Sequence, residues 1–453
     1  MKTNIKSLFI AACLLCTINA SAYDFEVGGI YYTEVLNAGI CTVTSGPEKY
    51  KGDIVIPETV KYSGNTYTVQ EIGSGAFKQC KELKSVSIPN SVIKIRDGAF
   101  SGSGLVNITI SSSVVTIGNT VFEGCSNLTN ITIPNSVTNI GSRVFSNCGL
   151  TSITIPSSVT VIAQSMFSGC ANLTNVTIPN TITEISSGAF ECCTSLTSIS
   201  IPNSVTAIYG SAFRSCSNLI SVTIPNSVNT IGSYAFEGCS SLTSVTLSNS
   251  ISQIEKNTFE NCSSLTNVIL PYSVETIGEH AFGYCSSLTD FIIPNSVTEI
   301  GINLFAGCKN LTSVTIGNSV TRVPALFENC INLTSVTIGS SVTEIGSYLF
   351  DKCEALTELY CLNPRPPRVG FSCFGNHYNT TTVFVPEEAL TTYQNADTWK
   401  YFKNLRGLNA TGIENAEVES GKDNEVYYDL RGNRLNAPKR GLNIINGKKV
   451  IVK

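Results

Sequence analysis

Apolar residues recur along this chain in blocks of 22 or 23 residues, each marked by a phenylalanine at the same position. The marker residues are Phe77, Phe100, Phe122, Phe145, Phe167, Phe190, Phe213, Phe236, Phe259, Phe282, Phe305, Phe327 and Phe350. Before each marker, apolar and polar residues alternate, as Val176 and Ile178 do with their neighbours, which indicates a half-buried β-strand. Pro179 ends that strand, and a second extended run follows it. Because one such block cannot bury its own apolar face, we expect the blocks to stack.

The repeat predicts a mainly β solenoid of about 13 to 14 coils, each 22–23 residues long, with parallel strands and a small cap at each end. We divide the chain into a signal peptide (1–22), an N-terminal β cap (23–70), the solenoid (71–375), a C-terminal cap (376–408), and a linker with a short β module (409–453). In each coil we expect the marker phenylalanine to fill the core at a short helical or 3₁₀ corner.

The first residues have the pattern of a secretory signal. Lys2 and Lys6 precede an apolar run, 8–18, that is too short to span a bilayer. The sequence A-S-A ending at Ala22 is typical of a cleavage site, so we expect the mature chain to begin after it. An alternative is lipoprotein processing at Cys13, because I-A-A-C resembles a bacterial lipobox. No other segment is apolar for long enough to form a membrane helix.

Charge is scarce in this chain, at 14% of residues against roughly 25% in an average soluble protein. Serine, threonine and asparagine supply most of the polar surface instead. The net charge of −4 gives no basis for nucleic acid or an anionic membrane as a partner.

Most of the 18 cysteines follow the repeat, three residues after a marker phenylalanine. These are Cys80, Cys125, Cys148, Cys170, Cys193, Cys216, Cys239, Cys262, Cys285, Cys308, Cys330 and Cys353. Parallel Cβ atoms in neighbouring coils would lie about 4.8 Å apart, farther than a disulfide needs, so we expect buried free thiols. Outside this column, Cys361 and Cys373 form the one pair for which a disulfide deserves a test.

Residues with catalytic chemistry are sparse. His280 and His377 are the two histidines, and neither lies beside a recognisable nucleophile motif. We interpret His280 as a solvent-facing repeat residue. No zinc-type cysteine spacing, phosphate-binding loop or dinucleotide motif occurs. We therefore predict no enzymatic activity, no cofactor and no metal.

The aligned repeat, I-P-x-S-V-x-x-I-G-x-x-A-F-x-x-C, covers residues 50–375 and resembles the BspA-type leucine-rich repeat proteins of Bacteroidetes. The start Y-D-F-E-V-G-G-I-Y-Y is similar to members of that family, and 427–435 with 441–453 resembles the short C-terminal sorting modules of the same phylum. The resemblance implies a secreted or surface protein that binds host proteins or other cells.

The outward positions of the strands form a column of serine and threonine that is interrupted near residue 290. The predicted partner-binding residues are Ile269, Asp290, Phe291, Ile292, Thr223, Thr246 and Thr315. Apolar side chains clustered on a polar face suggest a contact patch, although Phe291 replaces a core valine and has an inward position as its alternative. We predict a secreted or cell-surface protein whose strand surface binds macromolecules, with a protein partner preferred. Carbohydrate binding for polysaccharide capture is the alternative, but the strand column offers almost no aromatic residues for it.

Overall fold

A computed structural model describes residues 23–36 and 38–408, together with the backbone of four short strands between 427 and 452. The signal peptide, the lipobox at Cys13 and the linker 409–426 lie outside the described residues. The chain divides into two compact units, 1–140 and 141–453. Coils of parallel strands build both units, with about 15 turns in all and little helix, so the predicted solenoid class is confirmed.

The first unit begins with a β cap that leads into the first coils. Its strands are β1 (Phe25–Val27), β2 (Ile30–Val35), β3 (Ile40–Thr44), β4 (Gly52–Val55), β5 (Thr59–Tyr62), β6 (Asn65–Ile72), β7 (Leu83–Ser87), β8 (Lys94–Ile95), β9 (Asn107–Thr109), β10 (Thr116–Ile117) and β11 (Asn139–Ile140). Strands β1, β2 and β3 pair antiparallel, and β3 then pairs with β6 in parallel. From there the ladders β6-β8-β10-β11 and β4-β7-β9 are parallel. The ring of Tyr50 lies 4.5 Å from that of Phe77, which joins the cap to the marker column.

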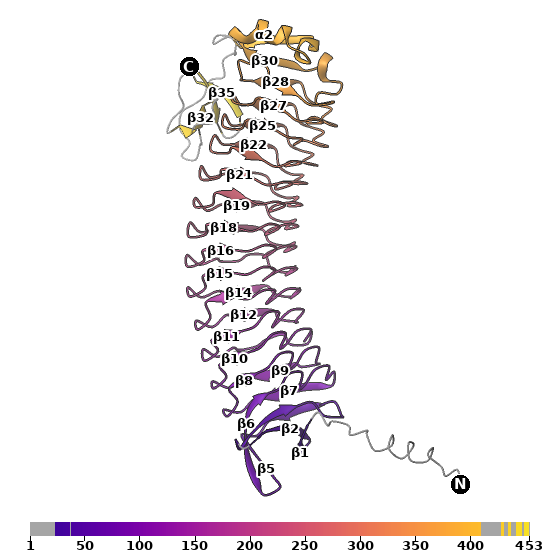
Figure 1. The fold of residues 1–453 in the computed structure, drawn as a ribbon, viewed down its shortest axis with the longest axis vertical. Helices are drawn as coiled ribbons and strands as arrows, with labels where there is room; N and C mark the ends of the chain where they lie inside the picture. Colours follow the sequence, from indigo (N-terminus) through magenta and orange to yellow (C-terminus); the bar gives the residue numbers. More distant parts are fainter. Residues whose placement is uncertain are drawn as a thin grey trace, which may run out of the picture. The chain divides into compact units, whose positions relative to one another are not determined.

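The second unit carries two series of strands, visible as stacked coils in Figure 1. The first series is β12 (Ser152–Thr154), β14 (Asn175–Thr177), β17 (Ser221–Thr223), β19 (Ser244–Thr246), β22 (Asp290–Ile293), β24 (Ser313–Ile316), β26 (Ser335–Ile338), β28 (Glu358–Cys361), β30 (Thr382–Pro386) and β31 (Asn404–Leu408). The second series is β13 (Val161–Ile162), β15 (Glu184–Ile185), β16 (Ala207–Ile208), β18 (Thr230–Ile231), β20 (Gln253–Ile254), β21 (Thr276–Ile277), β23 (Glu299–Ile300), β25 (Arg322–Val323), β27 (Glu344–Ile345) and β29 (Arg368–Val369). Each residue pairs with the residue at the same repeat position of the next coil.

The marker phenylalanines form the centre of the core. All thirteen are buried. In the second unit, rings of successive coils stack with centroids 5.3 to 6.3 Å apart. Stacking at the coil spacing lets each ring bury its two faces against identical neighbours, which confirms that this position fills the core. The predicted helical or 3₁₀ corner is wrong, because the markers lie in turns and no helix is assigned among the described residues before His377.

The cysteine column lies beside the phenylalanines, and its sulfurs remain thiols. All sixteen described cysteines are free, and fifteen of them are buried, including Cys361 and Cys373. Cys192, outside the column, is exposed. A typical column thiol, that of Cys239, donates to the carbonyl oxygen of Phe213 in the preceding coil at 3.2 Å. The prediction of buried free thiols is confirmed for the described residues.

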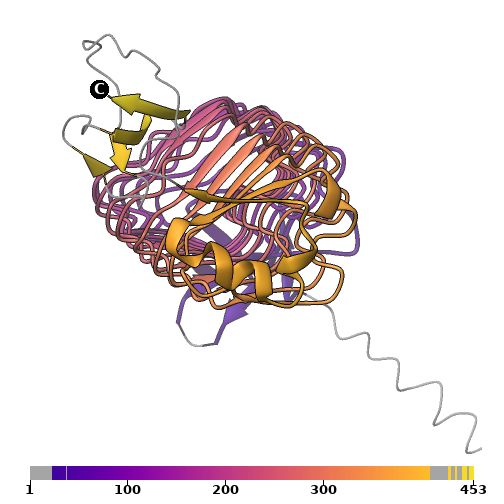
Figure 2. The same ribbon diagram turned by 90° about the horizontal axis from the view of Figure 1, so that it is seen from above.

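The last coils carry a helical cap. Its elements are η1 (His377–Asn379), η2 (Glu387–Ala389), α2 (Leu390–Asn395) and η3 (Trp399–Tyr401). Figure 2 shows these short helical segments lying across the end of the coils. Trp399 is buried there, and its indole N–H donates to the carbonyl oxygen of Pro367 at 2.9 Å.

Beyond the cap, four strands form an antiparallel sheet in the order β33-β32-β34-β35. They are β32 (Tyr427–Asp429), β33 (Arg434–Leu435), β34 (Gly441–Ile445) and β35 (Lys448–Val452). We refer to residues 427–453 as the C-terminal module. Among the described residues, no helix has the length and apolar character needed to cross a membrane.

Candidate partner-binding surface

Six neighbouring strands of the first series, β22, β24, β26, β28, β30 and β31, form the longest parallel sheet of the second unit. Side chains on a strand alternate between its faces, so Val314 and Val336 point into the core and are buried. On the opposite face Ser313, Thr315 and Ser335 are half-buried, and Thr337 is 4% exposed. The strand register places Ile292 opposite Thr315, and Thr337 opposite Tyr360. One column of outward positions therefore runs continuously across the sheet.

Asp290, Ile292 and Thr315 lie on this sheet, whereas Thr223, Thr246 and Ile269 occupy the equivalent repeat position in earlier coils, outside the six strands. Thr223 and Thr246 are exposed, and Ile269 is 57% exposed. Ile292 and Thr315 occupy the same column in later coils and are half-buried. Their placement agrees with the predicted strand face, while their role in binding stays a prediction.

The structure shows that Phe291 does not belong to the predicted contact patch. Its side chain is 2% exposed, because it pairs in register with the buried Val314 and points into the core. Its ring packs 4.8 Å from that of Phe282 and 4.9 Å from that of Phe305. The inward alternative is therefore right, and Phe291 cannot contact a partner on the surface.

The column also contains two aromatic residues that the sequence interpretation missed. Tyr360 and Phe384 continue it in β28 and β30, with ring centroids 4.7 Å apart and planes inclined by 14°. The sequence contains the information needed to place Tyr360. The segment E-L-Y-C of β28 aligns with S-V-T-I of β26, which puts Tyr360 at the threonine position. Degeneration of the repeat after Phe350 concealed this alignment. We call the outward residues Ile269, Ile292, Thr315, Thr337, Tyr360 and Phe384 the strand-face stripe.

Two carboxylates flank the stripe in the neighbouring outward column. Asp290 accepts hydrogen bonds from the Ser313 hydroxyl at 2.6 Å and from the Thr312 hydroxyl at 3.3 Å. Glu358 accepts one from the Tyr360 hydroxyl at 3.0 Å. Burial, and secondarily the charge of Glu358, raises the pKa of Tyr360, so its hydroxyl stays protonated and remains the donor. The surface thus combines apolar contact area with fixed negative charge.

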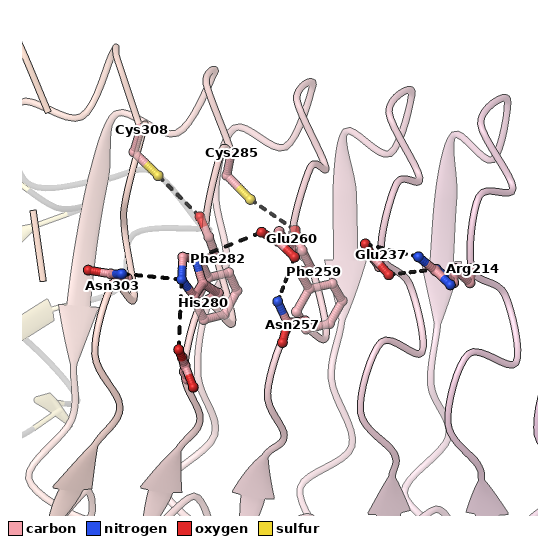
Figure 3. A network of polar contacts seen from close by, with 11 residues as sticks. Arg214, Glu237, Asn257, Phe259, Glu260, His280, Phe282, Cys285, Asn303 and Cys308 are labelled. Atoms are coloured by element: carbon pink, nitrogen blue, oxygen red, sulfur yellow. Dashed lines mark hydrogen bonds and ion pairs between the residues drawn. The ribbon is translucent and has the colours of Figure 1, made fainter. Parts of the chain in front are cut away.

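A second polar cluster, drawn in Figure 3, combines charged side chains that directly follow marker phenylalanines, such as Arg214 and Glu237, with Asn257, His280 and Asn303, which lie two residues before the next markers. Arg214 lies between two glutamates of adjacent coils, with its Nε 2.6 Å from Glu237 and its Nη1 3.7 Å from Glu191. Farther along, Asn257 donates to Glu260 at 2.5 Å. Partly exposed ion pairs of this kind contribute under about 1 kcal/mol each. They align neighbouring coils rather than create a reactive centre.

His280 belongs to this cluster, and the structure corrects its predicted solvent-facing position. Its side chain is 23% exposed, with the ring nitrogens 3.8 Å from Glu260 and 3.9 Å from Glu279. Asn303 lies 3.2 Å from Nε2. The thiol of Cys285 donates to the carbonyl of Phe259, and burial raises its pKa to about 12. The thiolate is the nucleophilic form of cysteine, so a buried thiol that stays protonated cannot serve as the nucleophile of a cysteine–histidine pair.

The remaining chemistry of the described residues gives no reactive site. His377 is buried at the C-terminal cap, and this burial lowers its pKa. No group of three or more histidine, cysteine or acidic side chains within 23–36 and 38–408 is arranged to hold a metal ion. The strand-face stripe, which departs from the serine and threonine column of the earlier coils, is therefore taken as the candidate site.

Comparison with known proteins identifies the repeat. The family model for the BspA type leucine-rich repeat region matches residues 58–174, 138–263, 211–326 and 323–415, which together cover most of the sequence. The chain belongs to the BspA-type leucine-rich repeat family. No curated protein matches it.

Two solved structures are similar to this BspA-type chain. A leucine-rich repeat protein from Bacteroides ovatus is 29% identical, with a TM-score of 0.65, and the match covers 80% of this chain and 100% of that one. A leucine-rich cell surface protein from Faecalibacterium prausnitzii is 28% identical, with a TM-score of 0.50, and the match covers 85% and 95% of the two chains. The family and both neighbours are leucine-rich repeat proteins, and the Faecalibacterium protein is described as a cell surface protein.

Proposed function

We propose that this protein is a non-enzymatic binding protein of the bacterial cell surface, and that the strand-face stripe recognises a protein on a host or neighbouring cell. The observation that carries the proposal is the change in one outward column. Thr223 and Thr246 are exposed polar residues, whereas the same repeat position holds Ile269, which is 57% exposed, and the half-buried aromatic residues Tyr360 and Phe384. Exposed apolar residues on an otherwise polar face are typical of a contact surface.

A binding protein of the cell surface must be exported from the cytoplasm, and the proposal therefore includes an export signal. Residues 1–22 act as a signal peptide that is removed after Ala22, with lipid attachment at Cys13 as the alternative route. The Faecalibacterium relative is itself described as a cell surface protein, which supports this location.

Carbohydrate is the second candidate partner, because the Tyr360–Phe384 pair supplies aromatic surface. The two rings are stacked at 4.7 Å, so each covers one face of the other. Sugar-binding platforms need open ring faces, and Thr337 and Arg406 occupy the neighbouring register positions on either side of the pair. A polypeptide that packs against ring edges and the isoleucines fits this arrangement better.

The test uses the double variant Ile269→Thr with Ile292→Thr, which restores the residue type of the repeat. Partners are first captured from host matrix proteins and from a glycan array, and affinities are then measured by titration. We expect binding to weaken by about tenfold or more, because central interface anchors contribute roughly 1–2 kcal/mol or more.

The matched control is Thr154→Ser with Thr177→Ser, in the same column but outside the stripe. Both variants should keep the melting temperature of the parent chain, since surface substitutions change stability by under about 0.5 kcal/mol. Unchanged affinity of the isoleucine variant for every captured partner would remove the stripe as the binding surface.

A further inference from the structure

The outward column changes in accessibility as well as in composition. It is exposed through Thr223, Thr246 and Ile269, but Ile292 and Thr315 are half-buried, and Thr337 is 4% exposed. The strand register is regular across this region, so a slip of the sheet is not the cause. Ile269 is 57% exposed and Tyr360 and Phe384 are half-buried, so apolar area in this column remains open to an occupant, and a segment of the same chain can reach it.

The chain leaves the sheet beside the stripe. Its last described residue before the gap is Leu408, the end of β31, and β31 is the final strand of the sheet that carries the stripe. The 18 residues 409–426 separate it from the C-terminal module. An extended segment of that length reaches about 60 Å, whereas the stripe spans five coil steps, or about 24 Å. The module can therefore reach every residue of the stripe.

The net charge of the C-terminal module is opposite in sign to that of the residues flanking the stripe. After Asp429 the module contains seven basic residues and no acid: Arg431, Arg434, Lys439, Arg440, Lys448, Lys449 and Lys453. The outward positions of β22, β24, β26, β28 and β30 contain two acids, Asp290 and Glu358, and no lysine or arginine; Arg406 of β31 borders the last of them. A basic module tethered beside an acid-flanked apolar face is held near it at high effective concentration and with favourable electrostatics.

We propose that the C-terminal module, 427–453, packs on the strand-face stripe of its own chain and masks it. The inference rests on the proposed function, because the surface it covers is the one assigned to the partner. Partner binding then requires the module to be displaced, and the module regulates access to the stripe.

The experiment measures the accessibility of the stripe in the full mature chain. A cysteine is introduced by Thr315→Cys, in a Cys192→Ser background that removes the exposed native thiol. The matched control is Thr223→Cys, at the same repeat position outside the stripe. The rate of modification by a maleimide reagent is measured at both positions. Because Thr315 is half-buried and Thr223 is exposed, position 315 should react somewhat more slowly in any case. Masking predicts a larger difference, with position 315 at least about tenfold slower in low salt and with the excess removed when the module is displaced.

Charge reversal then tests the occupant. In full-length chains that also carry Lys448→Glu and Lys449→Glu, the rate at position 315 should rise toward that at 223. Raising salt to about 1 M, where the Debye length is about 3 Å, should act in the same direction. Equal rates at 315 and 223 in the parent, or protection that neither change reduces, would overturn the proposal.

Partner affinity separates this inference from the proposed function. If the module masks a genuine binding surface, the charge-reversed chain binds the captured partner more tightly than the parent, by about the factor by which labelling accelerates. If accessibility rises but affinity does not change, the module covers the stripe and the assignment of the partner to the stripe fails. If the isoleucine variant loses affinity while labelling shows no protection, the proposed function stands and the masking fails.

Discussion

At the scale of single residues, the repeat depends on a fixed relation between phenylalanine and cysteine. The carbonyl oxygen of Phe213 accepts the N–H of Cys216 in its own coil at 3.2 Å and the thiol of Cys239 in the next coil at 3.2 Å. The thiol is small and a weak donor, so it fills the space beside the ring and uses the second lone pair of the carbonyl. The same contact recurs along the second unit, for example between Cys262 and Phe236.

The buried thiols predict that the protein loses stability in alkali. Burial raises the pKa of Cys285 to about 12, against about 8.5 in an unfolded chain. Above about pH 8.5, the unfolded state releases a thiol proton that the folded state retains, so the free energy of unfolding falls as pH rises. Each such thiol contributes a slope of about 1.4 kcal/mol per pH unit.

Denaturant unfolding of the parent and of Cys285→Ala between pH 7 and 10.5 checks this effect. The variant should show a shallower alkaline slope, by about 1.4 kcal/mol per pH unit, and the two slopes should agree below about pH 8. Equal slopes above pH 9 would show that this thiol ionises in the folded protein.

At the scale of elements, close approach between the backbones of successive coils decides which turns need glycine. A Cβ placed on Gly278 would lie 2.5 Å from the backbone nitrogen of Lys256 and 2.8 Å from the carbonyl carbon of Glu255. At Gly283, the nearest atom to an added Cβ is a side-chain nitrogen of His280, at 3.2 Å. The first position has no space for a methyl group, whereas a side chain can move at the second.

We therefore expect Gly278→Ala to lower the free energy of unfolding by about 1–3 kcal/mol, the usual cost of overpacking. The control Gly283→Ala should cost clearly less. Thermal and denaturant unfolding of the two variants provide the comparison, and equal losses would contradict the role assigned to the close backbone approach.

At the scale of the whole molecule, each coil contacts its neighbours in the stack, so stability is a sum over coils and their interfaces. Removal of residues 239–261, one complete period, joins Gly238 to Cys262 and keeps every later residue at its repeat position. We expect this shortened chain to fold, with an unchanged circular dichroism signal per residue.

The control deletes residues 239–249, about half a period, and moves the following strand out of register. Its inward and outward side chains then no longer match the neighbouring coils, and we expect a loss of several kcal/mol and a broadened unfolding transition. If both deletions behaved alike, stability would not depend on the register between coils.

The sequence by itself determined the coil, its period, the buried phenylalanines and the free thiols, because a 22- or 23-residue repeat brings equivalent residues into contact whatever lies beyond it. It also placed Ile269 and Ile292 on the outward face, since side chains on a strand alternate. The tertiary structure decided the rest. Phe291 points inward because its register partner Val314 does, and His280 is covered by Glu260 of the preceding coil and by its own chain neighbour Glu279. Tyr360 and Phe384 join the stripe through pairing with coils whose sequence no longer repeats, and such contacts are specified by the fold rather than by local pattern.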